Sequence, residues 1–442
     1  MASNPKTLGS SGVLYTDRRD FYMRPNVVKE LWTDVTPFTT VVANQQTISG
    51  LKDPQFKMFE HRNPWQKQEA QAHSDANNQV IAKDNAEDDI ELKASSLVGL
   101  EGEGGNTGYD SHIGLQIEVW DSTKTTKKGV CLITGKGSTK WVVKNMGDTN
   151  ITVETDDYLV VIGNAHGEGT VAATAWSDEL AVVYNQCQIF KTPLQITGTL
   201  LEASLRGESS ELARLRDQKS QEHKIQKERA FLFGRSPINI SGGFNDGSTA
   251  STDYHLSDTN GNRVRSCMGV IPAIEKHGAE TGADQSRFTI SEASYSYDSF
   301  VDDMEKVFQY VPEAGMKRAF CGMGAMSYFS KMSGASGLAG NSGWTVNLSD
   351  MKRDSLGFNY RVLESPHGAI QLIPTPVLRE AYNKTMLVVS DENLFHAQYR
   401  APKFQANILT DDAYDGVKDQ YMSDEGIGVT LIESHKLFNI TA

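Results

Sequence analysis

The sequence predicts a mixed α+β protein, and three observations indicate this fold class. A long helical segment, residues 199–235, stands in the middle of the chain. Before it, between Ile113 and Val171, short β-favouring runs recur about every ten residues and are separated by turn residues. After it, helical and strand-like segments alternate without a regular βαβ repeat. This order favours an α+β architecture over a doubly wound one.

The long helix is expected mainly in the second half of residues 199–235. This segment contains no proline, and it contains no glycine between Gly207 and Gly234. Ser209 and Ser210 are candidate N-caps, and Gly234 is a stop signal. A helix from residue 208 to residue 233 would span roughly 39 Å at about 1.5 Å per residue, which is longer than an ordinary globular helix.

The surface of this helix is expected to be polar on nearly all sides. An apolar stripe at helical spacing gives way to charged and amide side chains before Phe231 restores it. Such a helix is either a solvated surface helix or a spine whose polar sides face other copies of the chain. The stripe consists of Leu201, Leu205, Leu212 and Leu215. The candidate ion pairs, each worth a few tenths of a kcal/mol, are Glu202 with Arg206, Glu211 with Arg214, and Lys224 with Glu228.

The chain before the helix is expected to contain an arm, an extended segment and a small β module. About 25 N-terminal residues are rich in Ser, Gly, Arg and Asp, and a short helix is expected at 27–31. Residues 51–65 look extended, with Phe56 and Met58 alternating against Lys57 and Glu60. Residues 66–108 are very polar, and the glycine cluster at 99–105 indicates a flexible loop. The strands of the module are expected at 115–120, 130–134, 140–144, 151–154 and 159–162, and another strand is expected at 181–189.

The chain after the helix is expected to form the α+β domain. Phe300, Met304, Val307 and Val311 recur at helical spacing and predict an amphipathic helix. Further helices are expected at 267–277 and 325–332, and a glycine-rich loop is expected at 334–343. Strands are expected at 317–321, 360–364, 369–373, 385–390, 428–432 and 438–440.

Composition excludes several classes of protein. The 442 residues are 38% hydrophobic and 22% charged, so wholesale disorder is not expected. The net charge of −13 argues against a protein that grips nucleic acid through its phosphates. No apolar run reaches the roughly 18 residues of a membrane span, and the N-terminus lacks the apolar core of a signal peptide. We therefore expect no membrane partner.

No motif predicts catalysis, a cofactor or a metal. The four cysteines have no CxxC spacing, and buried reduced thiols are expected. Residues 322–327 resemble a dinucleotide fingerprint, but Ser327 replaces the third glycine. Residues 135–139 resemble a P-loop, but a glycine follows Lys136. The ten histidines are scattered without ligand spacing. The sequence therefore predicts a protein that is not an enzyme.

The order of the segments resembles that of a known family. Several phrases occur in the expected order, namely Thr36-Pro37-Phe38-Thr39-Thr40, Phe59-Glu60 with Pro64-Trp65, residues 157–165 with Glu168-Gly169-Thr170, residues 228–235, and Asp391-Glu392-Asn393-Leu394. Together they resemble the major capsid proteins of tailed bacteriophages, which have the Hong-Kong-97-type fold, and more narrowly the subfamily related to the capsid protein of phage SU-ten.

The resemblance implies a division of the chain into five parts. These are an N-terminal arm (1–45), an extended E-loop region (46–190) with the β module inserted at about 113–171, a P-domain with the spine helix (191–262), an A-domain (263–385), and returning P-domain strands with the C-terminus (386–442). It also implies a function, which is self-assembly through hexamers and pentamers into an icosahedral head shell that encloses double-stranded DNA without sequence-specific binding. The implied location is the virion, after assembly in the host cytoplasm.

Further partners and contact residues follow from the same resemblance. Portal, scaffolding and decoration proteins are candidate partners, and no cofactor is expected. The candidate inter-subunit residues are Arg18, Arg19, Phe21, Tyr22, Phe56, Lys57, Glu60, Trp65, Arg206, Arg214, Glu222 and Arg229. Two other interpretations stay open at this point. One is an encapsulin-like nanocompartment shell, and the other is a multidomain surface or carbohydrate-binding protein with the β module as its binding face.

Overall fold

The computed structural model describes residues 36–61, 69–73, 79–84, 86–92, 112–136, 140–172, 180–203, 211–236, 256–282, 284–310, 316–334, 347–353, 356, 358–408 and 415–441. The chain forms two compact units. The main unit consists of residues 1–59 and 182–442, and the second consists of residues 60–181. The short helix expected at 27–31 and the glycine cluster expected at 99–105 lie outside the described residues.

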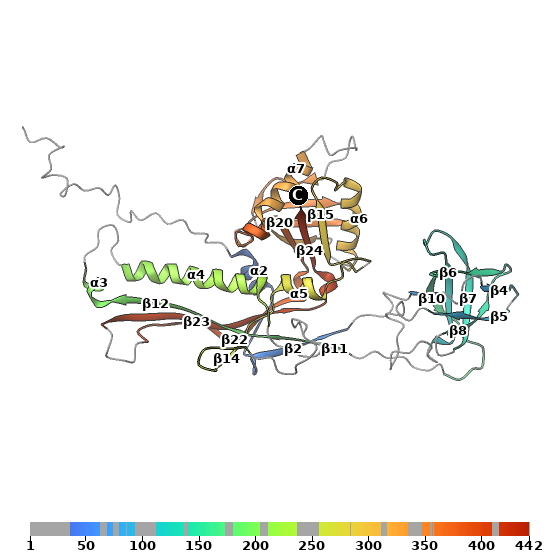
Figure 1. Ribbon diagram of the computed structural model, residues 1–442, viewed down its shortest axis with the longest axis horizontal. Coiled ribbons are helices and arrows are strands. Elements are labelled where there is room, and N and C mark those ends of the chain that lie inside the picture. Colours follow the sequence, from blue (N-terminus) through green and yellow to red (C-terminus); the bar gives the residue numbers. More distant parts are fainter. Residues whose placement is uncertain are drawn as a thin grey trace, which may run out of the picture. The chain divides into compact units, whose positions relative to one another are not determined.

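A four-stranded sheet in the main unit carries the long helix. Its strands follow the order β1-β22-β23-β12, with β1 parallel to β22 and the other pairs antiparallel. Helix α4 runs along β12 and β23 (Figure 1). The strands are β1 (Thr47–Ser49), β12 (Gln188–Thr197), β22 (Leu394–Gln405) and β23 (Gly416–Val429), and the helices are α3 (Gly198–Glu202) and α4 (Glu211–Phe233). Every second residue of β12 is buried, which places one face of this strand under the helix.

The predicted helical segment differs from the structure in two ways, namely the number of helices and one ion pair. The expected segment contains two helices, because α3 ends at Glu202 and α4 begins at Glu211. Of the leucine stripe, Leu201 is 38% exposed, Leu212 and Leu215 are half-buried, and Leu205 lies outside the described residues. The predicted pair of Lys224 with Glu228 is wrong, because Glu228 is fully buried whereas Lys224 is exposed. The predicted stop at Gly234 is confirmed.

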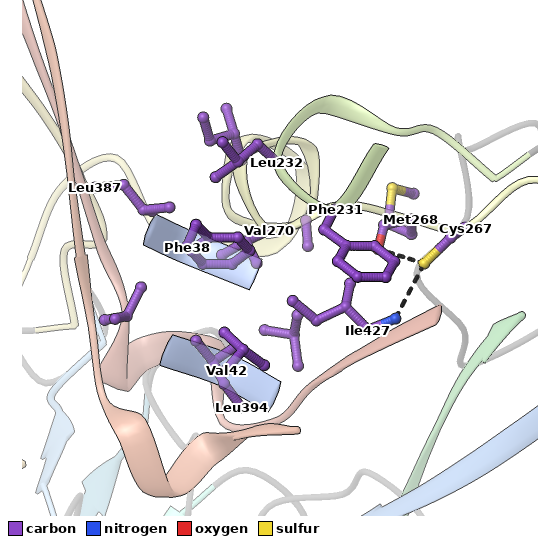
Figure 2. Close-up of a cluster of buried hydrophobic side chains, with 14 of the residues drawn as sticks. Phe38, Val42, Phe231, Leu232, Cys267, Met268, Val270, Leu387, Leu394 and Ile427 are labelled. Carbon is purple, nitrogen blue, oxygen red and sulfur yellow. Dashed lines mark hydrogen bonds between the residues drawn. The ribbon is translucent and has the colours of Figure 1, made fainter. Parts of the chain in front are cut away.

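One apolar core joins α4 to the strands that follow it in sequence. Phe231 and Leu232, at the end of α4, pack with Phe38 and Val42 of helix α2 (Pro37–Gln45). Helix α5 (Val270–His277) contributes Val270 to the same cluster (Figure 2). Phe231 and Leu232 are the buried apolar residues of α4, so apolar packing anchors this helix at its C-terminal end. Apolar burial of this kind contributes roughly 25 cal/mol per Å².

Gly234 and Gly269 let the backbones of α4 and α5 approach closely. The Gly269 amide donates to the Gly234 carbonyl at 2.7 Å. A Cβ atom on Gly269 would lie 2.8 Å from the Leu232 carbonyl oxygen, and a Cβ atom on Gly234 would lie 2.5 Å from the Cys267 carbonyl oxygen. Any larger residue would therefore push the two helices apart.

An eight-stranded mixed sheet forms the rest of the core of the main unit. Its order is β15-β24-β21-β16-β20-β19-β17, and β18 pairs with β19 beside this path. The pairs β15–β24 and β16–β20 are parallel, and the others are antiparallel. The strands are β15 (Arg287–Ser291), β16 (Met316–Cys321), β17 (Asn347–Leu348), β18 (Lys352–Arg353), β19 (Asn359–Ser365), β20 (Gly368–Pro374), β21 (Thr385–Val389) and β24 (Lys436–Thr441).

Helices α6 (Tyr297–Phe308) and α7 (Met323–Gly334) pack against this sheet. The Ser296 side chain caps α6 by accepting a hydrogen bond from the Ser299 amide. Phe300, Met304 and Val307 of α6 are buried at helical spacing, as the sequence predicts. The predicted strand at 428–432 is only partly correct, since β23 ends at residue 429 and a short 3₁₀ helix follows. Strand β24 lies in this sheet, although it belongs to the segment expected to return to the P-domain.

Smaller elements complete the main unit. Strand β2 (Gln55–Glu60) pairs with β11 (Ala181–Gln186), and β13 (Leu256–Ser257) forms a hairpin with β14 (Arg263–Val264). The 3₁₀ helices are η5 (Glu380–Tyr382), η6 (Asp391–Asn393) and η7 (Ile432–Ser434). The strand expected at 181–189 is two strands, because β12 starts at Gln188 and continues to Thr197.

The second unit is a small antiparallel β structure with its own core. Its six-stranded sheet has the order β3-β10-β6-β7-β8-β5, and β4 pairs with β9. The core is built around the fully buried Trp141 with residues such as Ile117 and Ile133. The strands are β3 (Glu69–Gln71), β4 (Gln79–Ile81), β5 (Glu87–Glu91), β6 (Leu115–Trp120), β7 (Lys127–Lys136), β8 (Lys140–Asn145), β9 (Ile151–Val153) and β10 (Tyr158–Asn164). The five strands predicted from 115–162 are confirmed, but three strands between residues 69 and 91 also belong to this structure.

Candidate assembly surface

Charged side chains attach the middle of α4 to strand β23. Arg216 Nη2 lies 2.7 Å from Asp419 Oδ2, and the Asp419 side chain is only 1% exposed. The Tyr421 hydroxyl donates to the Arg216 carbonyl at 3.1 Å, and the Arg216 guanidinium lies 5.3 Å from the centre of the Phe404 ring. The guanidinium therefore contacts both the carboxylate and an aromatic face.

His223 is the next contact along the helix. Its Nδ1 lies 3.0 Å from Thr192 Oγ1 on β12, and its Nε2 lies 3.1 Å from Ser423 Oγ on β23. Burial lowers the pKa of His223 to about 4, and the Lys227 charge acts in the same direction. The imidazole is therefore neutral at pH 7 and bonds to both hydroxyl groups without carrying charge.

Lys227 lies near the apolar end of the helix. Its Nζ is 3.2 Å from Glu425 Oε2, and the Glu425 side chain is fully buried. His396 Nε2 lies 3.0 Å from the same carboxylate oxygen. Burial opposes ionisation of Glu425, but the His396 hydrogen bond and the Lys227 charge outweigh it and hold the pKa of Glu425 below its usual value.

We call these contacts the polar seam, which consists of Arg216, His223 and Lys227 on α4 and Asp419, Ser423 and Glu425 on β23. Positions 216, 223 and 227 share one helix face, and positions 419, 423 and 425 share one strand face. The helical period of α4 and the two-residue period of β23 therefore bring these side chains together, although they are about 200 residues apart in sequence. The sequence did not reveal the seam, because its acidic residues lie about 200 positions after the helix. The pattern that could have indicated it is the run of polar residues at every second position of 419–425.

The outward side of α4 carries pairs within the helix. Arg214 Nε donates to Glu211 Oε2 at 3.0 Å, which confirms the predicted Glu211–Arg214 pair. Lys219 Nζ lies 2.6 Å from Glu222 Oε2, and Arg229 is exposed. The candidate contact residues Arg214 and Glu222 are thus placed on the helix surface but already hold partners on the same helix.

The β2–β11 ribbon presents different residues from those predicted. Phe56 and Glu60 are buried, at 7% and 4% exposure, and the Phe56 ring packs against Phe395. Residues 56, 58 and 60 share one face because the strand has a period of two, so the predicted grouping of Glu60 with Lys57 is wrong. Lys57 lies over the Tyr184 ring at 5.2 Å. Phe59, which was not among the predicted contact residues, is 65% exposed.

Six predicted contact residues lie outside the described residues. They are Arg18, Arg19, Phe21, Tyr22, Trp65 and Arg206. The described part of the chain therefore brings the predicted contact residues together only on α4 and on the β2–β11 ribbon.

Three further findings concern metal sites, membrane spans and the fingerprint-like glycines. Within the described ranges, no group of three or more His, Cys, Asp or Glu is arranged to hold a metal ion. No helix among these residues is long and apolar enough to cross a membrane. Gly322 and Gly324, in the fingerprint-like stretch, pack against Asn383, whose Oδ1 accepts a hydrogen bond from the Gly324 amide at 2.9 Å. These glycines serve backbone packing around α7.

Comparison with protein families gives a match over nearly the whole chain. The family model described as SU10 major capsid protein matches residues 24–429. The sequence matches none of the curated proteins with which it was compared.

Several solved structures resemble the fold at low sequence identity. The capsid of a native GTA particle is 8% identical, with 99% of this chain and 100% of that chain covered and a TM-score of 0.47. A chain of Mycobacterium phage Patience is 14% identical, with coverage of 64% and 76% and a TM-score of 0.40. The SrpI encapsulin of Synechococcus elongatus is 7% identical, with coverage of 60% and 77% and a TM-score of 0.37. At these TM-scores the structural likenesses decide nothing about function.

Proposed function

This chain belongs to the SU10 major capsid protein family, and we propose that its copies form hexamers and pentamers that close into an icosahedral head shell around packaged double-stranded DNA. It is a major capsid protein of tailed-phage type and a structural component of the virion. The predicted α+β, Hong-Kong-97-like fold class is confirmed. The observation that carries the proposal is the extent of the family match, residues 24–429.

Distributed surfaces perform this function. A closed shell needs heterologous contacts whose rotations close, so no single pocket carries the activity. We assign inter-subunit contacts to the outward side of α4, at Arg214, Glu222 and Arg229, and to the exposed side of the β2–β11 ribbon, at Lys57 and Phe59. Charged contacts contribute more to register and partner choice than to affinity. An aromatic residue that is exposed in the subunit can become a buried anchor when subunits associate.

The parts of the chain receive the following roles in this proposal. Residues 1–45 form the arm, 46–190 the E-loop region, 191–262 the P-domain, 263–385 the A-domain, and 386–442 the returning strands and C-terminus, with β24 joining the A-domain sheet. The polar seam keeps α4 at one angle on its sheet. A helix held in this way presents a fixed surface to neighbouring subunits.

The charge of the chain supports a container for DNA. Residues 60–181 contain 20 acidic and 10 basic side chains, a net charge of −10, within a total of −13 for the chain. A strongly attractive wall would bind DNA during assembly and hold it against packaging and ejection. We propose enclosure without sequence-specific binding, with portal, scaffolding and decoration proteins as further partners and assembly in the host cytoplasm. Dense positive potential over the inner face of the assembled shell would contradict this.

The contents of purified particles test the proposed function. Particles recovered after nuclease treatment of infected cells are expected to contain genome-length DNA that is protected from digestion. Particles filled with a cargo protein and free of DNA would instead identify a nanocompartment. Persistent monomers that bind glycans would identify a surface or carbohydrate-binding protein.

A further inference from the structure

Helix α2 begins against a carboxyl group that comes from α4. The residue before the helix, Thr36, makes no capping hydrogen bond with its side chain. Instead, Glu228 Oε2 accepts a hydrogen bond from the Thr39 amide at 3.3 Å. Thr39 is the third residue of α2, and its amide is one of those left without a partner inside the helix. Glu228 therefore takes the place that an N-cap side chain normally fills.

The surroundings of Glu228 do not suit an ionised carboxylate. Its side chain is fully buried, and Oε1 has no hydrogen-bond partner among the described residues. No described residue forms an ion pair with it, and α2 itself has no ionisable side chain. On α4, Lys224 points to solvent and Lys227 is bound to Glu425. On the neighbouring strands, Glu425 and His396 are bound to one another.

The elements on either side of Glu228 are tied to the core. One turn after Glu228, Phe231 and Leu232 pack with Phe38 and Val42 of α2, and Figure 2 shows these side chains converging. Loss of the contact at residue 228 therefore weakens the first turn of α2 directly.

We propose that Glu228 is a proton-linked clasp on α2: its protonated carboxyl group holds the first turn of α2 in the core, and loss of the proton releases that turn. The neutral group keeps its acceptor for the Thr39 amide and places no charge in the core. The ionised group would be a buried charge without a cationic partner, and only the hydrogen-bond donors at the start of α2 would compensate it, which is a costly arrangement.

The direction of the pH dependence follows from the difference between the two states. Burial raises the pKa of Glu228 from its usual 4.5 to about 8, although the amides of Thr39 and Phe38 act in the opposite direction. In the released state the group is exposed, and its pKa returns to near the usual value. The docked state therefore holds the proton more tightly. Docking is strongest below about pH 4.5 and weakens by up to roughly tenfold per pH unit until about pH 8.

Hydrogen–deuterium exchange of the full chain tests this clasp. Exchange of the α2 amides, residues 38–45, is measured by mass spectrometry between pH 5 and pH 9 and corrected for the intrinsic pH dependence of exchange. In the wild-type protein, the protection of these amides is expected to fall as the pH rises. In Glu228→Gln, which cannot ionise, this fall in protection is expected to be absent. Asp217→Asn, an exposed carboxyl-to-amide change on the same helix, is expected to behave like the wild type.

Two results would overturn the clasp. One is constant or rising protection of α2 in the wild-type protein, and this readout stands even if Glu228→Gln fails to fold. The other is a pH dependence in Glu228→Gln that matches the wild type. Burial lowers the pKa of Lys317 to about 7 and that of Lys436 to about 8, so these groups stabilise the fold as pH rises and have the opposite sign. The measurement needs no shell assembly, so its failure leaves the proposed function unaffected.

Discussion

At the scale of single residues, Lys227 shows why α4 stays on its sheet. Its side chain is 12% exposed, and its ammonium group faces the fully buried carboxylate of Glu425. An exposed pair of this kind would contribute little, because solvent screens it. A buried carboxylate that loses its cationic partner is costly, because its remaining charge is left poorly compensated.

We expect Lys227→Met to lower the free energy of unfolding of the main unit by about 3 kcal/mol, as for the loss of one partner of a buried pair. Urea denaturation, followed by an optical signal from the main unit, measures the change. Lys224→Met, an exposed position on the same helix, serves as the control and should change the midpoint little. Equal midpoints for the two variants would show that the pair with Glu425 does not hold the helix.

Only some of the ion pairs of α4 could be predicted from the sequence. The pair of Glu211 with Arg214 was predictable, since both residues lie on one helix three positions apart. The partners of Arg216 and Lys227 were not, because Asp419 and Glu425 reach them only through the pairing of β23 with β12. Likewise, Glu228 looked like a surface residue paired with Lys224, but the docking of α2 buries it.

At the scale of elements, α4 combines an internal attachment with an outward charged surface. The seam holds one face, and Arg214 and Glu222 lie on the helix surface in pairs with residues of the same helix. Because a pair within one helix contributes only about 0.3–0.5 kcal/mol, these charges can change without unfolding the subunit. Their effect is therefore expected in assembly.

We expect Arg214→Glu to leave the subunit soluble and folded but to reduce the yield of shells. Sedimentation of expressed material measures the fraction in particles. The matched control is the exchange Glu211→Arg with Arg214→Glu, which restores an ion pair within the helix. If the yield of shells is still reduced in the exchanged variant, the defect arises from a contact between subunits. An unchanged particle yield in Arg214→Glu would remove this part of α4 from the interface.

The β2–β11 ribbon allows a comparison of adjacent faces. Phe59 is exposed and Phe56 is buried, although both are aromatic residues of one strand. We expect Phe59→Ser to melt like the wild-type subunit but to assemble poorly. Phe56→Ser should instead destabilise the subunit by about 3 kcal/mol, as for the loss of a buried aromatic side chain. Thermal unfolding and particle yield separate the two effects. Normal assembly of Phe59→Ser would remove it from the proposed contacts.

At the scale of the whole molecule, the sequence predicted the type of most elements better than their partners. Periodicity located α6, the end of α4 and five strands of the second unit, because each has a local pattern of burial. It missed β3, β4 and β5 between residues 69 and 91, where acidic residues such as Asp88 and Asp89 obscure the alternation. These strands form by pairing with β10, β9 and β8, and no local pattern encodes that pairing.

The distribution of charge also belongs to this scale. The 60–181 unit carries most of the net negative charge and has its own apolar core. The main unit is closer to neutral and contains the polar seam, in which acids are matched by bases.

Electron microscopy of the purified, concentrated protein tests the central claim that copies of this chain tile with one another. The account predicts closed shells, or the hexamers and pentamers from which they form. A protein that stayed small and monodisperse at high concentration would contradict it.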